Sequence, residues 1–373
     1  MTEIPKNVVK LDGKTILVTG AAGFIGAALS RRLLNDCCGG KIIGLDSLND
    51  YYDVTLKEKR LSDLDRVAVD SANGNEWCFV KGSIADKEMV ERLFAEYEPS
   101  VVVNLAAQAG VRYSIENPRA YMEANVIGFF NVLEACRHSY DIGKGVEHLV
   151  YASSSSVYGD NAKIPYSVGD KTDSPVSLYA ATKKSNELMA HTYSKLYNIP
   201  ATGLRFFTVY GPAGRPDMAY FKFAERMRTG QDIEIYNYGH CERDFTYIDD
   251  IVEGIVRVMG KAPDKCQGEN GLPIPPCSVY NIGRGKPVNL LDFVTILQEE
   301  LKKAKVLPAD YDFESHRKLL PMQPGDVAVT YADTKAMEQV FGYRPLTDLR
   351  MGLRKFAEWY KNEVAGGDIC GKK

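Results

Sequence analysis

Two side chains that could carry acid–base chemistry stand four residues apart in the segment 177–197, which reads SLYAATKKSNELMAHTYSKLY. This segment has the pattern of a helix, so Tyr179 and Lys183 would share one of its faces. A free tyrosine has a pKa of ~10 and is a poor base at neutral pH, but a neighbouring positive charge lowers that pKa. The pair therefore predicts a phenol that accepts a proton from a substrate. A half-buried tyrosine beside a surface lysine is the alternative interpretation.

Four consecutive serines stand where another hydrophobic run ends, in the segment 151–160, which reads YASSSSVYGD. Serines often bond to the backbone of their own turn, and this local role alone is expected for Ser153. Ser154 lies 25 residues before Tyr179, at the end of a predicted strand. This placement favours a chemical role for Ser154.

Residues 19–26 read TGAAGFIG and place three glycines between a predicted strand and a predicted helix. Glycine permits a tight turn, a close approach of the backbone to a pyrophosphate, and close packing of the helix on the sheet. Asp46 ends the next predicted strand, KIIGLD, 20 residues after Gly26. A carboxylate there would bind an adenosine ribose and repel a 2′-phosphate, which predicts NAD rather than NADP. A turn or cap residue is the alternative for Asp46.

The elements that would position these groups follow from the apolar pattern between Lys14 and Phe207. Short runs that are apolar throughout alternate with helical patterns, as expected for a parallel sheet buried on both faces. The runs are KTILVTG, KIIGLD, WCFVKG, SVVVNLAA, EHLVYASS and ATGLRFF. We therefore predict an α/β fold with a doubly wound parallel sheet of the Rossmann type.

After residue 211 Pro and Gly clusters become frequent, for example in the segment 262–277, which indicates a second, smaller and less regular α/β lobe. Apolar residues three and four apart predict amphipathic helices over 289–304 and 349–364. We expect a NAD-binding domain over 1–211, joined by part of about 238–290. The rest of 212–373 is expected to be mainly a substrate-binding lobe.

The composition excludes several classes of function. The 373 residues are 45% hydrophobic and 25% charged, with a net charge of −3, so a small-molecule ligand is expected and a nucleic acid is not. No signal-peptide pattern and no run of about 18 apolar residues occurs, which predicts a cytoplasmic protein without a membrane segment. The eight cysteines and five histidines lack metal-ligand spacing, so no metal is expected. His148, at the start of a core strand, is expected to be structural.

Several motifs together resemble the extended short-chain dehydrogenase/reductase family, and within it the nucleotide-sugar epimerases. The matching segments are TGAAGFIG, NLAAQAGVRYS, EANVIG with Asn125, SSSSVYG, YAATK, RFFTVYGP and RDFTYIDD. Two further segments, GPAGRPDMA and LLPMQPGDV, are most similar to the UDP-glucuronate 4-epimerases. The resemblance covers nearly the whole chain.

The resemblance implies a mechanism in which Tyr179 takes the proton of a sugar 4-hydroxyl while a hydride passes from carbon 4 to NAD. Lys183 would also hold the nicotinamide ribose, and its charge together with that of the nicotinamide cation would lower the pKa of Tyr179. Ser154 would share the proton path. The 4-keto sugar would rotate and take the hydride back, so that NAD stays bound. The implied NAD-binding residues are Gly20, Gly23, Phe24, Ile25, Gly26, Asp46, Ser83, Ile84, Leu105, Ala106, Ala107, Tyr179 and Lys183. Many relatives have aspartate where this chain has Ser83, and the Ser83 hydroxyl could take over its hydrogen bond to adenine.

The serines also bear on the substrate. Related sugar dehydratases usually have Asp-Glu where this chain has Ser155 and Ser156, and hydroxyls cannot act as the acid and base that elimination needs. A uronate would pass through a 4-keto form that loses carbon dioxide readily, so its carboxylate must be held. Ser155, Ser156 and Thr208 are suitable donors. Galactose-type epimerases commonly carry asparagine at the position of Thr208.

Other residues are assigned to the UDP-sugar from the resemblance or from their chemistry. Arg215 and Arg243 could bind the UDP end, because guanidinium groups offer paired donors, or could form ordinary ion pairs. By family position, Gln108 and Arg112 would line the sugar pocket and Asp326 would lie near the uridine ribose. A homodimer is expected through the helix of Tyr179 and the helix after Asn125.

The function predicted is a 4-epimerase that interconverts UDP-glucuronate and UDP-galacturonate. A UDP-hexose or UDP-N-acetylhexosamine 4-epimerase is the alternative within the same enzyme class. A catalytically silent NAD-binding regulator is the alternative outside it, although the pair of Tyr179 and Lys183 would then serve no purpose.

Overall fold

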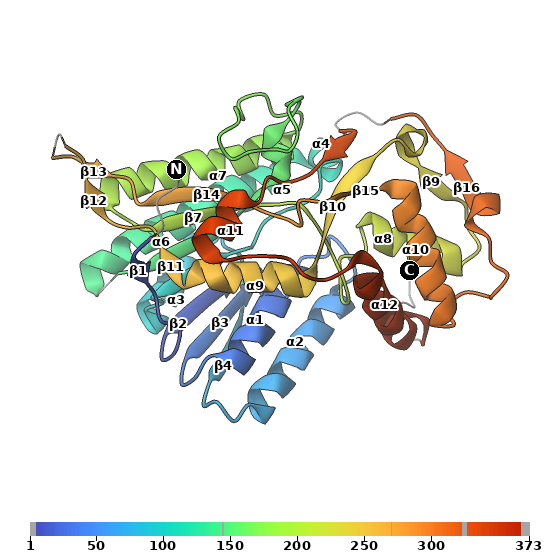
Figure 1. Ribbon diagram of the computed structural model, residues 1–373. Helices are drawn as coiled ribbons and strands as arrows, with labels where there is room; N and C mark the ends of the chain where they lie inside the picture. The colour runs from blue at the N-terminus through green and yellow to red at the C-terminus, as the bar shows by residue number, and fades with distance from the viewer. Residues whose placement is uncertain (1–4, 144, 270, 323–326, 367–373) are drawn as a thin grey trace.

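Within the residues that the computed structural model describes (5–143, 145–269, 271–322 and 327–366), seven parallel strands form one central sheet (Figure 1). The order across the sheet is β14-β7-β6-β5-β2-β3-β4. The strands are β2 (Thr15–Thr19), β3 (Lys41–Asp46), β4 (Glu76–Lys81), β5 (Val101–Asn104), β6 (His148–Ser154), β7 (Ala201–Phe206) and β14 (Cys277–Ile282). The predicted doubly wound Rossmann sheet is confirmed.

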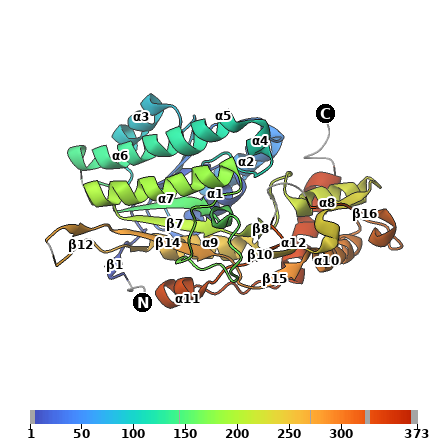
Figure 2. The same cartoon turned by 90° about the horizontal axis from the view of Figure 1, so that it is seen from above.

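Helices cover both faces of this sheet, which explains why its strands are apolar throughout. One face carries α1 (Phe24–Asp36), α2 (Val54–Asp70) and α9 (Ile248–Met259), and the other carries α3 (Lys87–Tyr97), α6 (Gly128–Ile142) and α7 (Leu178–Tyr197). Along β2, Ile16 and Val18 belong to the first core and Leu17 to the second. In Figure 2, α6 and α7 lie side by side on one side of the sheet and α9 lies on the other.

A smaller mixed sheet forms the second lobe, at the right of Figure 1. It contains β8 (Thr208–Tyr210), β10 (Glu242–Tyr247), β15 (Pro287–Asn289) and β17 (Val329–Thr330), while β9 (Ile233–Ile235) pairs separately with β16 (Arg317–Leu319). The helices α8 (Ala219–Arg228), α10 (Leu290–Lys303) and α12 (Leu349–Tyr360) accompany these strands. Helices α10 and α12 confirm the two amphipathic helices expected from the sequence. The rings of Phe245 and Phe293 stack at 4.0 Å in this core.

Parts of the chain after residue 211 pack with the large sheet. Strand β14 is parallel to β7 at its edge, α9 packs on α1, and α11 (Lys335–Phe341) packs on β14 and α9. Strand β8 begins two residues after β7 ends, and β10 runs directly into α9. These short connections fix the smaller sheet close to the carboxyl ends of the large one.

The remaining elements are short. Strand β1 (Asn7–Val8) pairs with β11 (Lys261–Ala262), and the segment 262–277 contains a hairpin of β12 (Cys266–Gln267) and β13 (Pro273–Ile274). The helices α4 (Tyr113–Glu116) and α5 (Pro118–Tyr121), with a π-helical turn over Met122–Ile127, precede α6. None of the helices in the described residues has the length and apolar character needed to cross a bilayer.

Candidate active site

A cavity of about 500 Å³ lies at the carboxyl ends of the large-sheet strands, where open α/β sheets bind their ligands. Its lining includes the ends of five neighbouring strands, with Gly20 after β2, Asp46 on β3, Leu105 after β5, Ser154 on β6 and Phe207 after β7. Residues from later in the chain complete the lining, and these are Thr208, Val209, Arg215, Met218, Arg243, Val327 and Thr330. The cavity therefore joins the nucleotide-type turn to the smaller lobe.

The glycine-rich turn leaves the start of α1 open to this cavity. Gly20 has a φ of +72°, and a Cβ on Gly26 would lie 2.1 Å from the Gly20 carbonyl oxygen. Side chains at these positions would force the backbone to move. Gly23 begins the helix, and in the described structure no side chain caps it. The first amides and the helix dipole can thus receive an anion, so the turn fits the pyrophosphate of NAD.

Asp46 lines the cavity beside this turn. Its carboxylate accepts a hydrogen bond from the Ala22 amide at 3.1 Å and another from the Leu48 amide at 2.9 Å. A carboxylate has about four lone-pair sites, so Asp46 can still accept from a ribose. Ser83 and Ile84 line the same end of the cavity, and the Ser83 hydroxyl accepts from the Ala85 amide at 3.1 Å. These positions fit the adenosine half of NAD.

Tyr179 and Lys183 both line the cavity from the first turns of α7, and the Ser177 hydroxyl caps this helix by accepting from the Ala180 amide. Burial raises the pKa of Tyr179, whereas a hydrogen bond with Ser154 and the charge of Arg215 act against that rise. The protein groups alone therefore raise the pKa of Tyr179, whereas the lowering expected from the sequence included the charges of Lys183 and of a nicotinamide cation. The reason is that desolvation of the phenol outweighs its polar neighbours.

Lys183 is almost fully buried, with 3% of its surface exposed. Its ammonium group donates a hydrogen bond of 2.9 Å to the Ala152 carbonyl on β6. Burial lowers the pKa of Lys183 to about 8. The side chain is therefore mostly charged at neutral pH and is held at the floor of the cavity.

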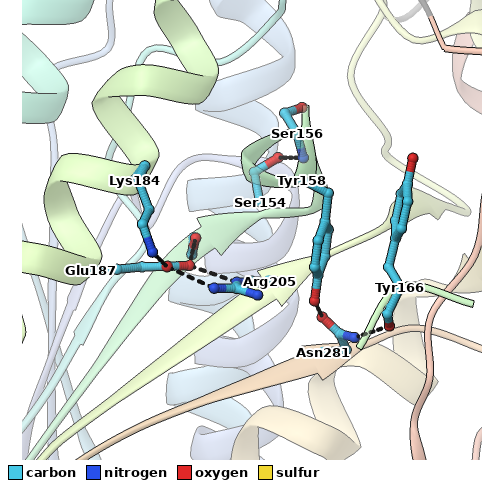
Figure 3. Close-up of polar contacts among 9 residues, drawn as sticks. Ser154, Ser156, Tyr158, Tyr166, Lys184, Glu187, Arg205 and Asn281 are labelled. Atoms are coloured by element: carbon cyan, nitrogen blue, oxygen red, sulfur yellow. Dashed lines mark hydrogen bonds and ion pairs between the residues drawn. The ribbon is translucent and has the colours of Figure 1, made fainter. Parts of the chain in front are cut away.

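The serine run forms the end of β6 and a 3₁₀ turn over Ser155–Tyr158. The Ser154 hydroxyl caps this turn by accepting from the Ser156 amide at 3.1 Å (Figure 3). Ser155 and Ser156 line the cavity. The expectation that Ser153 only bonds its own turn is wrong, because its hydroxyl donates to Glu187 on α7 at 2.7 Å. The two residues are far apart in sequence, so only the fold reveals this contact.

The two arginines chosen for the UDP end both line the cavity. Arg215 is paired with Asp217 through two contacts, Nε to Oδ1 at 3.0 Å and Nη2 to Oδ2 at 2.7 Å. Tyr51 donates to the same carboxylate at 3.2 Å. Arg243 donates to the carbonyls of Glu242 and Ala328. Both guanidinium groups are thus oriented by the protein beside the cavity.

Of the other residues predicted to bind the UDP-sugar, some line the cavity and some do not. Gln108 lines the cavity, whereas Arg112 is not among the described lining residues and its guanidinium lies over the Tyr236 ring at 4.7 Å. The cavity position expected for Arg112 from family position is therefore not observed. Asp326 lies outside the described residues. Thr208 follows β7 and lines the cavity near the serine turn.

Some lining residues were not predicted from the sequence. Asn49, Tyr51 and Lys57 follow Asp46, in a segment whose first residues, NDYYD, could have drawn attention to this side of the cavity. Asn125, on the π-helical turn, is buried behind the lining and binds both the amide and the carbonyl group of Gln108. Its Oδ1 accepts from the Gln108 amide at 2.8 Å, and its Nδ2 donates to the Gln108 carbonyl at 3.0 Å. Asn125 therefore shapes the cavity wall.

Comparisons with known proteins agree with this geometry. The sequence profile of the NAD dependent epimerase/dehydratase family matches residues 16–283. An uncharacterized 37.6 kDa protein of Escherichia coli O111:H- is 50% identical, over 93% of this chain and 98% of its own length. A probable UDP-glucuronate 4-epimerase of Rhizobium meliloti is 44% identical, over 92% of this chain and 96% of its own. The crystal structure of the Bacillus cereus UDP-glucuronic acid 4-epimerase with UDP-glucuronic acid and NAD is 30% identical, with a TM-score of 0.75, and the match covers 93% of this chain and 99% of that one.

Proposed function

Since this chain belongs to the NAD-dependent epimerase/dehydratase family and is an NAD-dependent nucleotide-sugar epimerase, we propose that it interconverts UDP-glucuronate and UDP-galacturonate. The observation that carries this proposal is the group of hydroxyl side chains on Ser155, Ser156 and Thr208, which lines the cavity beside Ser154 and Tyr179. Relatives named as UDP-glucuronate 4-epimerases support the same substrate pair.

The protein groups suit inversion at carbon 4. Tyr179 takes the proton of the sugar 4-hydroxyl and returns it, and its hydrogen bond with Ser154 gives that proton a second acceptor. Lys183 stays mostly charged at neutral pH and stabilises the phenolate that results. Bound NAD supplies the redox chemistry, because it can accept a hydride from carbon 4 and give it back.

The lining argues against elimination of water. Of the described residues that line the cavity, Asp46 is the only carboxylate. Strand β3, which carries Asp46, lies three strands from β6 in the sheet, a separation of roughly 14 Å. A 4,6-dehydratase needs an acid beside the sugar, and hydroxyl groups cannot replace it. The site therefore favours inversion without dehydration.

The hydroxyl groups also suit a uronate. Oxidation at carbon 4 makes a β-keto acid, which loses carbon dioxide when the breaking bond aligns with the ketone π system. Donors on Ser155, Ser156 and Thr208 can hold the carboxylate out of that alignment without burying another charge. Arg215 adds little net charge there, because Asp217 is bound to it.

One incubation tests the proposal. Purified protein is mixed with UDP-glucuronate, and the products are separated by chromatography. UDP-galacturonate is the expected product, whereas UDP-xylose would indicate a decarboxylase and unchanged substrate a binding protein. Faster turnover of UDP-glucose or UDP-N-acetylglucosamine than of UDP-glucuronate would refute the carboxylate argument. Tyr179→Phe is the matched inactive control.

We also propose a homodimer through the outer face of α6 and α7. The exposed large apolar side chains on these helices include Phe130 on α6 and Leu188 and Leu196 on α7, and Ile127 is exposed directly before α6. The two helices lie side by side in Figure 2, so these side chains can form one surface. Light scattering should give the mass of two chains, and Leu188→Lys should shift it toward one.

A further inference from the structure

A buried ion pair of Glu187 and Arg205 lies directly below the serine turn, Ser155–Tyr158 (Figure 3). Glu187 on α7 accepts from Arg205 on β7 through two contacts of 2.8 Å, from Nε and from Nη2. Both side chains are only 4% exposed. Arg205 keeps the pKa of Glu187 below its ordinary value, although burial alone would raise it. The pair is therefore ionised and rigid at neutral pH.

Glu187 connects the pair to the helix that carries the proposed base. It follows Lys183 by four residues and Tyr179 by eight, so the three side chains share one face of α7. Its carboxylate also accepts the Ser153 hydroxyl of β6 at 2.7 Å. Ser153 and Ser154 both line the cavity, and the hydroxyl of Ser153 anchors β6 to the helix. The distance between Tyr179 and Ser154 thus depends on Glu187.

Arg205 connects the pair to the serine turn. Its guanidinium lies 4.8 Å from the centre of the Tyr158 ring, and Tyr158 ends the turn that carries Ser155 and Ser156. The Tyr158 hydroxyl donates to Asn281 on β14 at 2.6 Å, and Asn281 donates to the Tyr166 carbonyl at 2.7 Å. The rings of Tyr158 and Tyr166 stack at 4.5 Å. The turn is therefore held from below by a chain of contacts that reaches the edge of the sheet.

Net stability is a poor explanation for this pair. Removing two charges from water costs several kcal/mol per ion, and apolar residues of similar volume often replace a buried pair without loss of stability. Two apolar side chains could not accept the Ser153 hydrogen bond or place a cation over the Tyr158 ring. They also could not form the two hydrogen bonds that fix α7 relative to β7. The arrangement instead specifies geometry.

We propose that Glu187 and Arg205 are positioning residues that hold Tyr179, Ser154 and the serine turn in register for catalysis. This inference rests on the proposed epimerase mechanism. The two side chains act through Ser153, Tyr158 and the backbone of α7. A displacement of about 1 Å at the reacting groups is enough to lower the rate about 100-fold.

The main test replaces the pair by apolar residues of similar length, Glu187→Met with Arg205→Met. The substrate is whichever of UDP-glucuronate, UDP-glucose and UDP-N-acetylglucosamine the wild type converts fastest. We expect a Tm close to that of the wild type, a KM within about threefold, and a kcat lower by about 10- to 100-fold. Retention of kcat within twofold would overturn the proposal. So would a fall in kcat that is matched by an equal loss of folded protein.

Ser153→Ala provides a second test if the double variant does not fold. It removes one hydroxyl and leaves both charges paired, and kcat should fall about tenfold at unchanged KM. An unchanged kcat would overturn the proposal here too. Glu300→Gln is the matched control, because Glu300 is buried and paired with Arg350 and Arg354 in the smaller lobe, away from the site. It should change Tm but not kcat.

The proposed function and this inference fail separately. Failure of the wild type to prefer UDP-glucuronate would count against the substrate assignment only, because the variants are compared on the best substrate. Loss of kcat in Glu300→Gln equal to the loss in the double variant would count against the positioning role only. Lys184→Met should stay within about twofold of wild-type kcat, since the Lys184 ammonium that contacts Glu187 is partly exposed to water.

Discussion

Replacement of Lys183 by methionine should stabilise the NAD-free protein at neutral pH while it removes activity. Burial lowers the pKa of Lys183 from 10.5 to about 8. Each factor of ten in that protonation equilibrium is worth about 1.4 kcal/mol, so the charged form costs about 3 kcal/mol of folding free energy. Loss of the hydrogen bond to the Ala152 carbonyl offsets about 1 kcal/mol. The expected gain for Lys183→Met at pH 7 is therefore about 2 kcal/mol.

The size of this stabilisation depends on pH in a defined way. The folded pKa lies below the unfolded one, so the folded state binds fewer protons between pH 8 and 10.5. The free-energy cost of burying charged Lys183 has its full value below pH 8. It decreases above pH 8 and falls to about 1 kcal/mol by pH 9.5. The advantage of Lys183→Met should therefore nearly vanish at pH 9.5.

Urea unfolding of NAD-stripped protein at pH 7 and pH 9.5 measures this difference. A gain of about 2 kcal/mol also corresponds to a rise in Tm of roughly 3 °C for a chain of this size. Lys184→Met is the matched control, because that lysine is partly exposed and paired with Glu187, so its loss should not stabilise the fold. Equal stability of Lys183→Met and wild type at both pH values would refute the assignment of the pKa shift to burial.

Three further outcomes are expected. Tyr179→Phe should reduce kcat by about 10²- to 10⁴-fold with nearly unchanged UDP-sugar binding, measured by product analysis and calorimetry; near-normal turnover would exclude Tyr179 as the base. Thr208→Val should lower the ratio of kcat/KM for UDP-glucuronate over UDP-glucose by about tenfold, since the hydroxyl that donates a hydrogen bond to the carboxylate is removed; an unchanged ratio would show that Thr208 does not bind the carboxylate. Asp46→Asn should raise the affinity for NADP relative to NAD by about tenfold, because a charge that repels a 2′-phosphate is lost; titration of the stripped protein with both nucleotides measures this ratio.

The fold was predictable from the sequence because its signals are local. Apolar runs without alternation marked the strands of the parallel sheet, and glycines at fixed spacing marked the turn that opens α1. Placing Gly20, Asp46, Ser154 and Tyr179 around one cavity then followed from the topology, because parallel strands end at one edge.

Contacts between distant segments could not be predicted in the same way. Arg112 follows NLAA and is expected in the sugar pocket, yet its guanidinium is stacked on Tyr236, which lies outside the large sheet. Ser153 differs from Ser154 only in the face of β6 to which it points, and that face meets Glu187. The direction of the Tyr179 pKa shift depends on how deeply α7 buries the phenol. Each of these outcomes is decided by packing, which spacing along the chain does not encode.

Arg60 on α2 shows how packing can also create a link within the site. It stands in the charged segment KEKRL, which is typical of a solvated helix face. In the fold its guanidinium is buried and donates to the Ala22 carbonyl at 2.8 Å and to the Ala213 carbonyl at 2.7 Å. Ala22 belongs to the glycine-rich turn, and Ala213 stands two residues before Arg215, which also lines the cavity. Because buried carbonyl groups need donors, one side chain satisfies both carbonyl groups and fixes the glycine-rich turn relative to the segment that carries Arg215.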